Sequence, residues 1–584
     1  MQIVFQAGTA AQAMVLTSMR FTALLALGLA LCGCKQQVKT PTKNWTEDGS
    51  GQAEAEHLFD FRDHTVESLV RAVYDNGEGA GEFSIVESLG GGVAALDYDR
   101  DGSIDLLFPG GGSIQRDEPL TGLPSTLWRQ RDGLQFRDCT ELAHLVPPKQ
   151  YSHGCTTGDF DNDGFDDVLI TGYDDLQLLH NLGDGTFAET ALTATPENYS
   201  WSSSAAWGDF NGDGNLDLYI ANYVDWSWEN HPACPSGTPG VMDVCTPNDF
   251  SGLNDTLYFS NGDGTFRRAD ESSGLEAGGK GLGVLVADFN SDGHADIYVA
   301  NDTTNNFLYL NDGTGSFLDA GLMSGTGLDG SGTPNGSMGI ALLDFDQNLE
   351  PDLWVTNYEN ESYALYENNG DARFMWATER AGLNSLGNLF VGFGTIAADL
   401  DLDGDEDLVV TNGHVMIHPK QSRTEQQSLL LANSEVGDSR RLVRQEFSAD
   451  SFFSKFHRGR GLICGDLDRD GDLDLVYSHT QEPAAILLNE TQTTGKLLSV
   501  DLVGTKSNRN AIGTRAILHT NRGKFLRSVV GGGSYLSQNP YTLHWGILPD
   551  EVIERLEIYW PSGILQSVTN LHAGAPLSIL ESPQ

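Results

Sequence analysis

The sequence is short of basic residues, of cysteine and of long apolar runs. Among 584 residues, 34 are Lys or Arg and 82 are Asp or Glu, which gives a formal net charge of −48. So acidic a chain repels a phosphate backbone, and this argues against a nucleic-acid partner. Only 7 cysteines occur, with neither a CxxC pair nor a histidine-rich metal signature. The apolar run near the N-terminus has about eleven residues, too few for a helix that spans a membrane.

That apolar run has the features of an export signal. Met19 and Arg20 precede the run FTALLALGLAL, which ends in Leu31-Cys32-Gly33-Cys34. A short cationic start, an apolar core and small residues before a cysteine are typical of a secretion signal. The Leu-x-Gly-Cys ending resembles a bacterial lipobox, which implies cleavage before Cys34 and lipidation of its thiol; the alternative is an ordinary signal peptide with a chance cysteine.

We therefore expect residues 1–34 to be a lipoprotein signal peptide and the polar residues 35–57 to be a flexible tether. The expected location is outside the cytoplasm, anchored to the bacterial cell envelope and facing the periplasm or the exterior. The lipid on Cys34 would be the chain's only link to the membrane.

Acidic residues gather in seven copies of the pattern Asp-x-Asp/Asn-x-Asp/Asn-x-x-x-Asp, here called Asp loops 1 to 7. Six copies have Gly after the third ligand position. The candidate ligands at positions 1, 3, 5 and 9 are Asp97, Asp99, Asp101 and Asp105; Asp159, Asp161, Asp163 and Asp167; Asp209, Asn211, Asp213 and Asp217; Asp288, Asn290, Asp292 and Asp296; Asp344, Asp346, Asn348 and Asp352; Asp399, Asp401, Asp403 and Asp407; and Asp466, Asp468, Asp470 and Asp474.

Carboxylates at this spacing, with a backbone carbonyl at position 7, can surround one hard cation, and Ca²⁺ accepts six to eight such oxygen ligands. An EF-hand would need Glu at position 12 and flanking helices. Position 12 here lies in apolar runs such as DLYIAN and DIYVAN, which are typical of strands. The pattern therefore predicts up to seven Ca²⁺ ions in loops between strands. Leu349 replaces Gly in the fifth loop, which we expect to be the weakest site or empty.

The Asp loops belong to a longer repeat. Each unit starts with a Gly-rich apolar strand, passes through the Asp loop and continues with three further strands, the last of which commonly opens with Phe. Four short strands repeated seven times predict a seven-bladed β-propeller over residues 58–492. A linear β-solenoid would need shorter and more regular repeats. The seventh unit lacks its last strand, and we expect the segment Leu58–Thr65 to supply it.

A different segment follows the repeats. Residues 496–584 contain alternating apolar runs separated by Gly, Asn and Pro turns, which indicate a small β domain. The predicted fold class is therefore all-β: a seven-bladed β-propeller with calcium loops and a small C-terminal β domain.

The third unit contains an insertion, Tyr223–Gly252. Cys234 and Cys245 lie within it, and export makes a local disulfide between them the expected pairing. Cys139 with Cys155 is a second candidate pair, whereas Cys464 lies in an apolar run typical of a buried thiol.

Aromatic residues of the same insertion are candidate ligand-binding residues. Tyr223, Trp226 and Trp228 carry rings of the kind that stack on sugars or anchor a protein partner. The alternative is that these rings cover the edge of the blade as a small satellite core.

No catalytic constellation is visible in the sequence. Ser534 lies in GGGSYLSQ, which is not a GxSxG elbow and has the composition of a glycine-rich turn. His414 and His418 are four apart but follow a strand, so helical metal ligation is not indicated. Arg509 and Arg515 could clamp an anionic group or form salt bridges within this acidic chain.

The repeats resemble the calcium-binding, integrin-type propeller repeats known as FG-GAP or VCBS repeats. The segments Ser507–Arg515, Gly531–Gln538 and Trp560–Gly563 look like those of an ASPIC/UnbV domain. Asn412–Val415 also fits that architecture, as found in secreted relatives of cartilage acidic protein. The resemblance implies the fold and calcium binding, but no ligand.

We expect a surface-anchored calcium-binding protein that binds a protein or glycan through its propeller loops. The alternative is an extracellular, calcium-dependent, lyase-like enzyme acting on polysaccharide, although the residues show no cluster that would supply its base. A purely structural component of the cell envelope is a third hypothesis.

Overall fold

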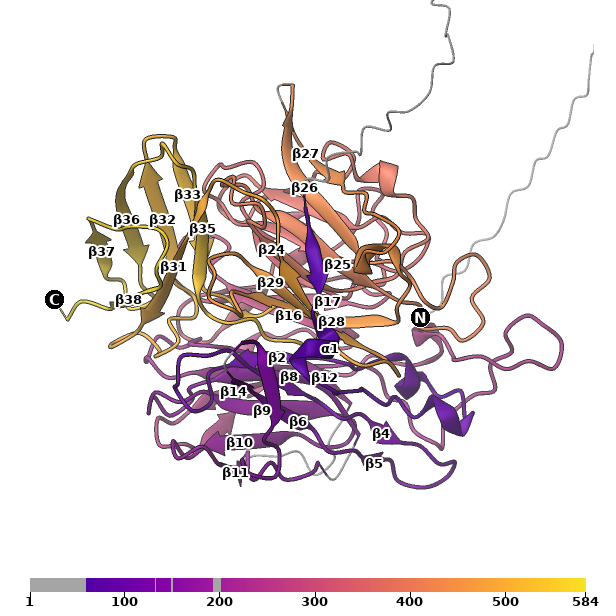
Figure 1. Cartoon of the computed structure of the whole chain (residues 1–584). Helices are drawn as coiled ribbons and strands as arrows, with labels where there is room; N and C mark the ends of the chain where they lie inside the picture. Colours follow the sequence, from indigo (N-terminus) through magenta and orange to yellow (C-terminus); the bar gives the residue numbers. More distant parts are fainter. Residues whose placement is uncertain (1–58, 132, 149–150, 193–200, 438, 584) are drawn as a thin grey trace, which may run out of the picture. The chain divides into compact units, whose positions relative to one another are not determined.

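The computed structural model describes residues 59–131, 133–148, 151–192, 201–437 and 439–583. The expected signal peptide, with Cys34, and the expected tether lie outside these residues. The described part consists almost entirely of strands and their connections (Figure 1). Within it, no helix has the length and apolar character needed to cross a membrane.

Seven antiparallel sheets, numbered here along the chain, each contain one Asp loop between their first two strands. Sheet 1 contains β2 (Ala94–Leu96), β3 (Asp105–Phe108), β6 (Thr126–Arg131) and β7 (Gln135–Asp138). Sheet 2 contains β8 (Ser152–Gly158), β9 (Asp167–Gly172), β10 (Gln177–Asn181) and β11 (Phe187–Thr190). Sheet 3 contains β12 (Ser202–Gly208), β13 (Asp217–Asn222), β14 (Thr256–Ser260) and β15 (Phe266–Arg268).

The remaining four sheets follow the same order of strands. Sheet 4 contains β16 (Gly281–Ala287), β17 (Asp296–Asn301), β18 (Phe307–Asn311) and β19 (Phe317–Asp319). Sheet 5 contains β20 (Ile340–Leu343), β21 (Asp352–Val355), β22 (Ala364–Asn368) and β23 (Phe374–Trp376). Sheet 6 contains β24 (Gly392–Ala398), β25 (Asp407–Asn412), β26 (Leu429–Val436) and β27 (Ser439–Arg444). Sheet 7 contains β28 (Gly459–Gly465), β29 (Asp474–His479), β30 (Ala485–Asn489) and β1 (Phe61–Asp63).

Short elements fill the connections. They are the hairpin of β4 (Gly112–Ser113) and β5 (Thr121–Gly122), the helices α1 (Thr65–Ser68) and α2 (Gly321–Ser324), and the 3-10 turns Glu78–Ala80, Ile85–Ser88, Pro247–Asp249, Glu271–Ser273, Leu383–Leu386 and Phe452–Ser454.

Burial explains the composition of the strands. In sheet 4, every residue of β16 and β17 is buried, so both faces of these strands carry apolar side chains. The outermost strand is different, because only its first residue is buried in several sheets. That residue is Phe187, Phe266, Phe317 or Phe374 in sheets 2 to 5, which accounts for the Phe that opens this strand in the repeat.

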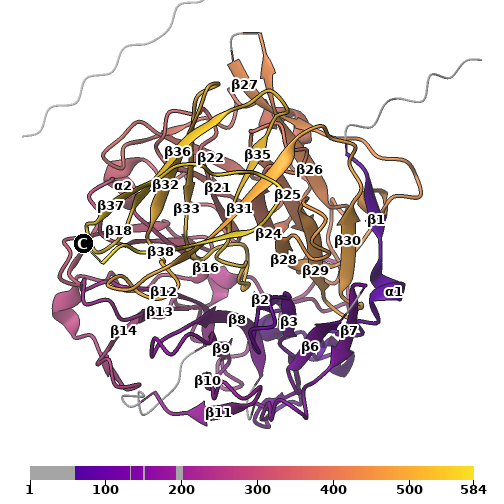
Figure 2. The same cartoon turned by 60° about the vertical axis from the view of Figure 1, so that its left-hand side comes forward.

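The sheets pack against one another in chain order. The first strands of consecutive sheets are in contact, from β2 with β8 through to β24 with β28. One apolar cluster contains Val93 and Phe108 of the first repeat together with Val476 and Ile486 of the last. The order of the sheets therefore returns to its start, as the view in Figure 2 shows. This arrangement is consistent with a β-propeller.

The N-terminal strand completes the last sheet. β1 pairs with β30 in antiparallel register, with Phe61 opposite Asn489 and Asp63 opposite Leu487. The expectation that the segment before the repeats supplies the missing strand is confirmed. An exposed edge of β30 is thereby covered.

A side-chain amide at the end of the third strand links neighbouring sheets, a contact that the repeat pattern does not indicate. Asn311 donates from Nδ2 to the carbonyl of Phe210 at 2.9 Å, and Phe210 is the second residue of the preceding Asp loop. The equivalent donors are Asn181, Asn368, Asn433, Asn489 and, from sheet 1 to sheet 7, Gln130. Sheet 3 has Ser260 at this position.

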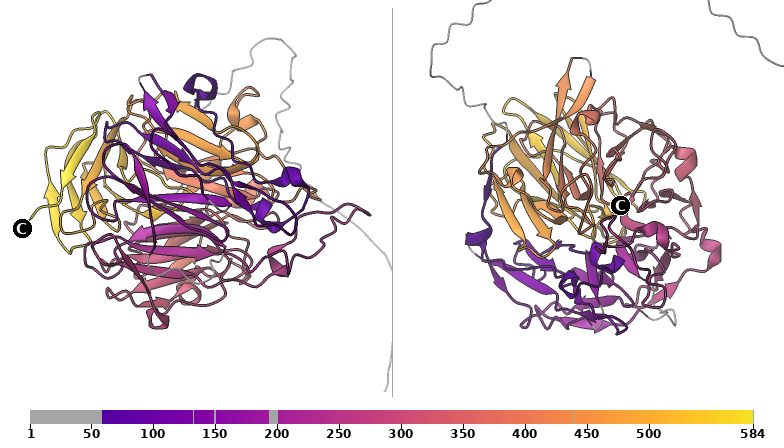
Figure 3. Two further views of the ribbon diagram at one scale, coloured as in Figure 1. Left: turned by 90° about the horizontal axis from the view of Figure 1, so that it is seen from below. Right: turned by 90° about the vertical axis from the view of Figure 1, so that its right-hand side faces the viewer.

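The C-terminal domain contains two sheets. One contains β35 (Leu543–Ile547), β31 (Lys496–Val503) and β38 (Leu577–Leu580), and the other contains β33 (Lys524–Ser528), β32 (Arg515–Thr520), β36 (Ile553–Tyr559) and β37 (Leu565–Val568). These strands form a separate layer to one side of the repeat sheets (Figure 3). Residues 496–583 thus have the all-β structure that we expected for this segment.

One stretch of this domain, Gly531–Gln538, leaves it and lies among the first strands of the repeats; we call it the central segment. Its first two residues form β34 (Gly531–Gly532), which pairs with β16 and also contacts β12. Ser534 donates its backbone N–H to Ile340 of β20 at 2.7 Å and accepts the N–H of Ile340 at 2.9 Å.

The rest of the central segment reaches the other sheets. The hydroxyl of Ser534 donates to the carbonyl of Leu462 at 2.7 Å and accepts the N–H of Thr395 at 3.2 Å, contacting sheets 7 and 6. The carbonyl of Leu536 accepts the N–H of Cys155 at 3.1 Å. At the start of β2, the backbone of Gln538 accepts the N–H of Ala95 and donates its own N–H to the carbonyl of Val93, both at 3.0 Å. The central segment therefore contacts the first strand of every sheet and joins the C-terminal domain to the repeats.

Candidate functional site

The seven Asp loops share one backbone conformation. Position 4 and position 6 lie in the left-handed region, with φ values of 54° at Arg100 and 83° at Gly102 in the first loop. Glycine adopts this conformation without strain, which explains Gly at position 6 in six loops. In the fifth loop, Leu349 has a φ of 70°, so the loop keeps its path despite the missing glycine.

The first Asp closes the turn in five of the seven loops; in the seventh, Oδ1 of Asp466 is buried and accepts no hydrogen bond from the described residues. In the second loop, Asp159 accepts the N–H of Asp163 at 3.0 Å through Oδ1 and the N–H of Gly164 at 2.8 Å through Oδ2. The same pair of contacts occurs at Asp97, Asp209, Asp288 and Asp399. The fifth loop differs, because Asp344 accepts only from Leu349, at 3.1 Å.

The Asp at position 9 lies at the start of the second strand and is buried in every loop. Asp296 accepts the N–H of Phe289 at 3.0 Å and the N–H of Asn311 at 2.8 Å, and so joins the loop to the third strand. The corresponding residues are Asp105, Asp167, Asp217, Asp352, Asp407 and Asp474. The Asp at position 9 therefore links the loop to the third strand and is also a candidate ligand.

Several carboxylate oxygens in these loops are buried and accept no hydrogen bond from the described residues: Asp99 Oδ1, Asp105 Oδ2, Asp344 Oδ1, Asp401 Oδ1 and Asp466 Oδ1. Leaving such oxygens unsatisfied is costly. Burial, reinforced by neighbouring carboxylates, raises the pKa of Asp105 to about 8 and that of Asp401 to about 7. A cation among the carboxylates would satisfy the oxygens and hold the groups ionised, so the donor set fits a hard divalent ion.

The loops are not equivalent. In two of them a basic side chain pairs with a carboxylate at position 3, 5 or 9, and in the sixth loop Arg440 pairs with Asp405 at position 7, at 2.6 Å. Arg129 of β6 contacts Asp99 at 2.6 Å and Asp101 at 3.0 Å in the first loop. His180 of β10 lies 3.0 Å from Asp167 through Nδ1 in the second. Both side chains come from the third strand, which the sequence pattern does not place beside the loop.

The C-terminal domain docks on the Asp loops. Asn510 accepts the N–H of Asp159 at 2.8 Å, and Gly546 donates its N–H to Asp399 Oδ2 at 2.8 Å. Arg515 donates to the carbonyl of Leu349 at 3.0 Å, whereas Arg509 uses its backbone N–H to reach the second loop. The loop conformations and the position of this domain are therefore coupled.

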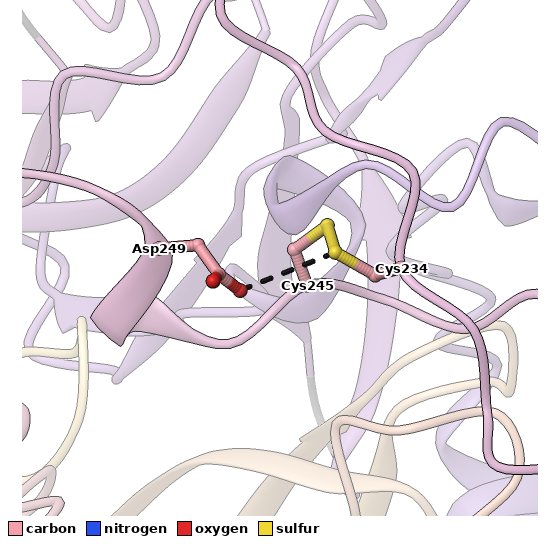
Figure 4. A group of neighbouring side chains, drawn as sticks. All are labelled: Cys234, Cys245 and Asp249. Atoms are coloured by element: carbon pink, nitrogen blue, oxygen red, sulfur yellow. Dashed lines mark hydrogen bonds between the residues drawn. A yellow bond between two sulfur atoms is a disulfide. The ribbon is translucent and has the colours of Figure 1, made fainter.

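The insertion of the third repeat connects β13 to β14 and lies at the strand ends opposite the Asp loops. Cys234 and Cys245 form a disulfide with a Cα–Cα distance of 5.3 Å. Figure 4 shows Asp249 beside it, 4.0 Å from Cys234 Sγ. The sulfur carries no proton in a disulfide, so this is a contact and not a metal site. Cys139 and Cys155, the second candidate pair, are separate buried thiols.

The aromatic candidates of the insertion do not share one environment. Tyr223 is 2% exposed and Trp226 is 3% exposed, and both pack around Trp201. The hydroxyl of Tyr223 donates to Asp302 at 2.6 Å. Neither ring has a free face, which corrects the expectation that they display binding faces and agrees with the satellite-core alternative.

Trp228 is only half-buried. Its indole N–H donates to the carbonyl of Glu118 at 2.9 Å, and the guanidinium of Arg116 lies 5.5 Å from its ring centroid. Of the three predicted rings, this one can contact a partner.

The remaining candidates have structural contacts. Ser534 is 2% exposed within the central segment, so no substrate reaches its hydroxyl. His414 is buried, with Nδ1 accepting the N–H of Met416 at 2.9 Å, whereas His418 donates its backbone N–H to Asp243 at 3.1 Å. The insertion thus contacts the β25–β26 connection through Asp243.

Two solved structures overlap with the chain at low similarity. A structure of an Agrocybe aegerita lectin that recognises non-reducing terminal N-acetylglucosamine has 17% identity and a TM-score of 0.38, covering 66% of this chain and 86% of the lectin. BBS1N, from a complex with ARL6DN soaked with mercury, has 11% identity and a TM-score of 0.36, covering 73% of this chain and 96% of that one.

Similarity in sequence is more specific. The FG-GAP-like repeat family matches residues 125–220, 240–299 and 288–355. The ASPIC and UnbV family matches residues 504–584. Human cartilage acidic protein 1 is 24% identical over 521 residues, which cover 84% of this chain and 71% of the relative. The Mus musculus protein is 26% identical over 534 residues, covering 79% of each. The chain therefore combines FG-GAP-like repeats with an ASPIC and UnbV domain and is homologous to cartilage acidic protein 1.

Proposed function

We propose that this chain is an exported calcium-binding protein whose repeats form a seven-bladed β-propeller that binds a protein or glycan at its face. The lipobox-like ending at Cys34 supports attachment to a bacterial envelope through a lipid. The Cys234–Cys245 disulfide fits an oxidising compartment outside the cytoplasm.

The seven-bladed architecture rests on the pattern of contacts. Each four-stranded sheet has one Asp loop, and the first and last repeats share an apolar cluster. The central segment contacts the first strand of each sheet, as a chain near a propeller axis would.

The buried, unsatisfied carboxylate oxygens carry the calcium proposal. Asp105, Asp344 and Asp401 each have one such oxygen among the described residues. Calcium would neutralise the clustered charge, and it would coordinate these oxygens, which otherwise lack a partner. Loops 3, 4, 6 and 7 have the least altered donor sets. Arg129 and His180 modify the first two loops, and Asn348 with Leu349 modifies the fifth.

The binding face is the one opposite the C-terminal domain. The Asp-loop face is occupied by that domain, through contacts such as Gly546 with Asp399. The opposite face presents the disulfide-held insertion, with half-buried Trp228 beside Arg116. An aromatic ring next to a guanidinium is a frequent anchor for protein partners and for sugars.

Thermal unfolding of the full chain in calcium and in chelator tests the calcium proposal. Each site saturated at about 100 times its Kd adds about 3 kcal/mol, so calcium should raise the Tm strongly. Asp401→Ala should lose part of that gain, whereas Asp550→Ala, at an exposed carboxylate outside the loops, should keep it. Equal Tm losses for Asp401→Ala with and without calcium would count against the assignment.

Ligand capture tests the binding proposal. The full chain, Trp228→Ala and a control at exposed Leu318 would be immobilised in calcium and exposed to a glycan array and to envelope extract. A saturable ligand lost only with Trp228→Ala supports the proposed face. Retention of every ligand by this variant would place the binding surface elsewhere.

A further inference from the structure

The connections of sheet 7 bring two histidines and a glutamate together, far along the strands from the Asp loop. His457 precedes β28, His479 is the last residue of β29, and Glu482 lies in the turn before β30. One possible ligand atom from each lies within 4.8 Å of the other two. None of the three belongs to the repeated Asp pattern.

Hydrogen bonding determines the tautomer of His479. Its Nδ1 lies 2.9 Å from the carbonyl oxygen of Pro483. A carbonyl can only accept, so Nδ1 carries the proton and Nε2 has a lone pair. His479 is 2% exposed, and Nε2 has no hydrogen-bond partner in the described part of the chain. A buried acceptor left in this way needs a partner.

His457 faces the carboxylate of Glu482. Its Nδ1 lies 3.0 Å from Glu482 Oε2, a separation at which one ion can bind both atoms in place of the proton they share. His479, held through Nδ1 by a carbonyl with Nε2 bare, is in the usual state of a metal-ligating imidazole.

The surroundings hold these side chains in place and leave one edge open. The backbone of His457 exchanges two hydrogen bonds with Gln426, and His479 pairs with Gly459. The ring of Phe452 stacks on His457 at 4.4 Å between centroids. The side chains of His457 and Glu482 are 17% and 33% exposed, which gives an ion a route from solvent.

Two guanidinium groups lie near the cluster. That of Arg460 is buried and donates to the carbonyl oxygens of Gly413 and Gly459. Arg458 donates its backbone N–H to Glu482 Oε1 at 3.3 Å, and its guanidinium is paired with Glu78 at 2.5 Å. We propose that His457, His479 and Glu482 bind one divalent first-row transition metal, for which Zn²⁺ is the representative ion. Two imidazoles and a carboxylate match the preferences of zinc and differ from the all-oxygen donors of the Asp loops.

Zinc titration of the full chain in saturating calcium tests this proposal apart from the calcium loops. A chromophoric zinc chelator would report competition for the ion. We expect one equivalent of tightly bound Zn²⁺. His479→Gln and Glu482→Gln should each weaken its affinity by more than about tenfold. His572→Gln, at an exposed histidine of the C-terminal domain, should leave the affinity unchanged.

Cobalt substitution gives a readout on the unmodified chain, should a variant fail to fold. Co²⁺ at the site should produce visible d–d absorption that zinc displaces stoichiometrically. No zinc bound in excess calcium, no displaceable Co²⁺ absorption, or wild-type affinity in both ligand variants would overturn the proposal.

Discussion

A Cβ atom added to Gly92 would lie 1.9 Å from the carbonyl oxygen of Leu536. The start of the first repeat and the central segment therefore meet backbone to backbone. Leu536 is also 2% exposed, and its carbonyl accepts the N–H of Cys155. No side chain at position 92 can be accommodated unless the central segment moves.

Gly92→Ala should displace the central segment and destabilise the repeats and the C-terminal domain together. Overpacking of this kind costs about 1–3 kcal/mol, and a lost backbone hydrogen bond adds to it. Urea unfolding of the full chain measures the change. Gly79→Ala is the matched control, since a Cβ there has no neighbour within 4 Å among the described residues. Equal stability of the two variants would contradict the prediction.

One amide donates across the junction between the first and last sheets, beside the apolar cluster that these two sheets share. Gln130 Nε2 donates to the carbonyl of Leu467 at 2.5 Å. Gln130→Met keeps the length of the side chain and removes the donor, so we expect a loss of about 1–3 kcal/mol in the free energy of unfolding. Gln492→Met, at an exposed position, should have little effect. Denaturant titration of the two variants measures the difference. An equal loss in the free energy of unfolding for Gln130→Met and Gln492→Met would show that the junction does not depend on this bond.

The fifth Asp loop is strained at Leu349. A non-glycine residue with a φ of 70° costs about 1–2 kcal/mol. Glycine would relieve this strain, but it loses more backbone entropy on folding, which offsets part of the gain. Leu349→Gly should therefore stabilise the protein by up to about 1 kcal/mol. Leu318→Gly, in the strand β19, should destabilise it instead. Differential scanning calorimetry decides, and a lower Tm for Leu349→Gly would contradict the strain argument.

Glu581 should make the C-terminal domain sensitive to acid. Burial opposes its ionisation, but the N–H groups of Thr505, Lys506 and Ser507, at 2.7 to 2.9 Å, and the Ser562 hydroxyl outweigh it and lower the pKa to about 2. A depressed carboxyl pKa gives stability that is complete above the unfolded value, near pH 4.5, and declines as pH falls toward 2.

The contribution is about 3 kcal/mol at neutral pH. The stability difference between wild type and Glu581→Gln, followed by urea unfolding, should therefore shrink between about pH 5 and pH 3. Glu554→Gln, at an exposed glutamate, should show no such trend. A difference that is constant with pH would refute the role of the charge.

Local patterns predicted much of the fold. The spacing of Asp97 to Asp105 and its six relatives recurs with apolar strands on either side, so the loops and strands could be read from nearby residues alone. The Cys234–Cys245 bridge was equally local. The pairing of β1 with β30 could be inferred because the last repeat lacked a strand.

Long-range contacts could not be predicted in the same way. The central segment, with Ser534 and Leu536, lies among strands that are hundreds of residues distant, and its glycines indicated only a turn. Arg129 stands beside the first loop because of the register of the third strand. Tyr223 and Trp226 are buried by neighbouring repeats, whereas the Pro-rich sequence around them is typical of an exposed loop.

The pairing of β1 with β30 also determines how the protein would respond to a pulling force. Tension that enters through the chain before residue 59 reaches the repeats first at Phe61, which is opposite Asn489. Because the force acts at the end of an antiparallel pair, the hydrogen bonds of β1 would open one after another, as in a zipper. The first mechanical event would be the release of a three-residue strand, with the other sheets and the central segment still in place.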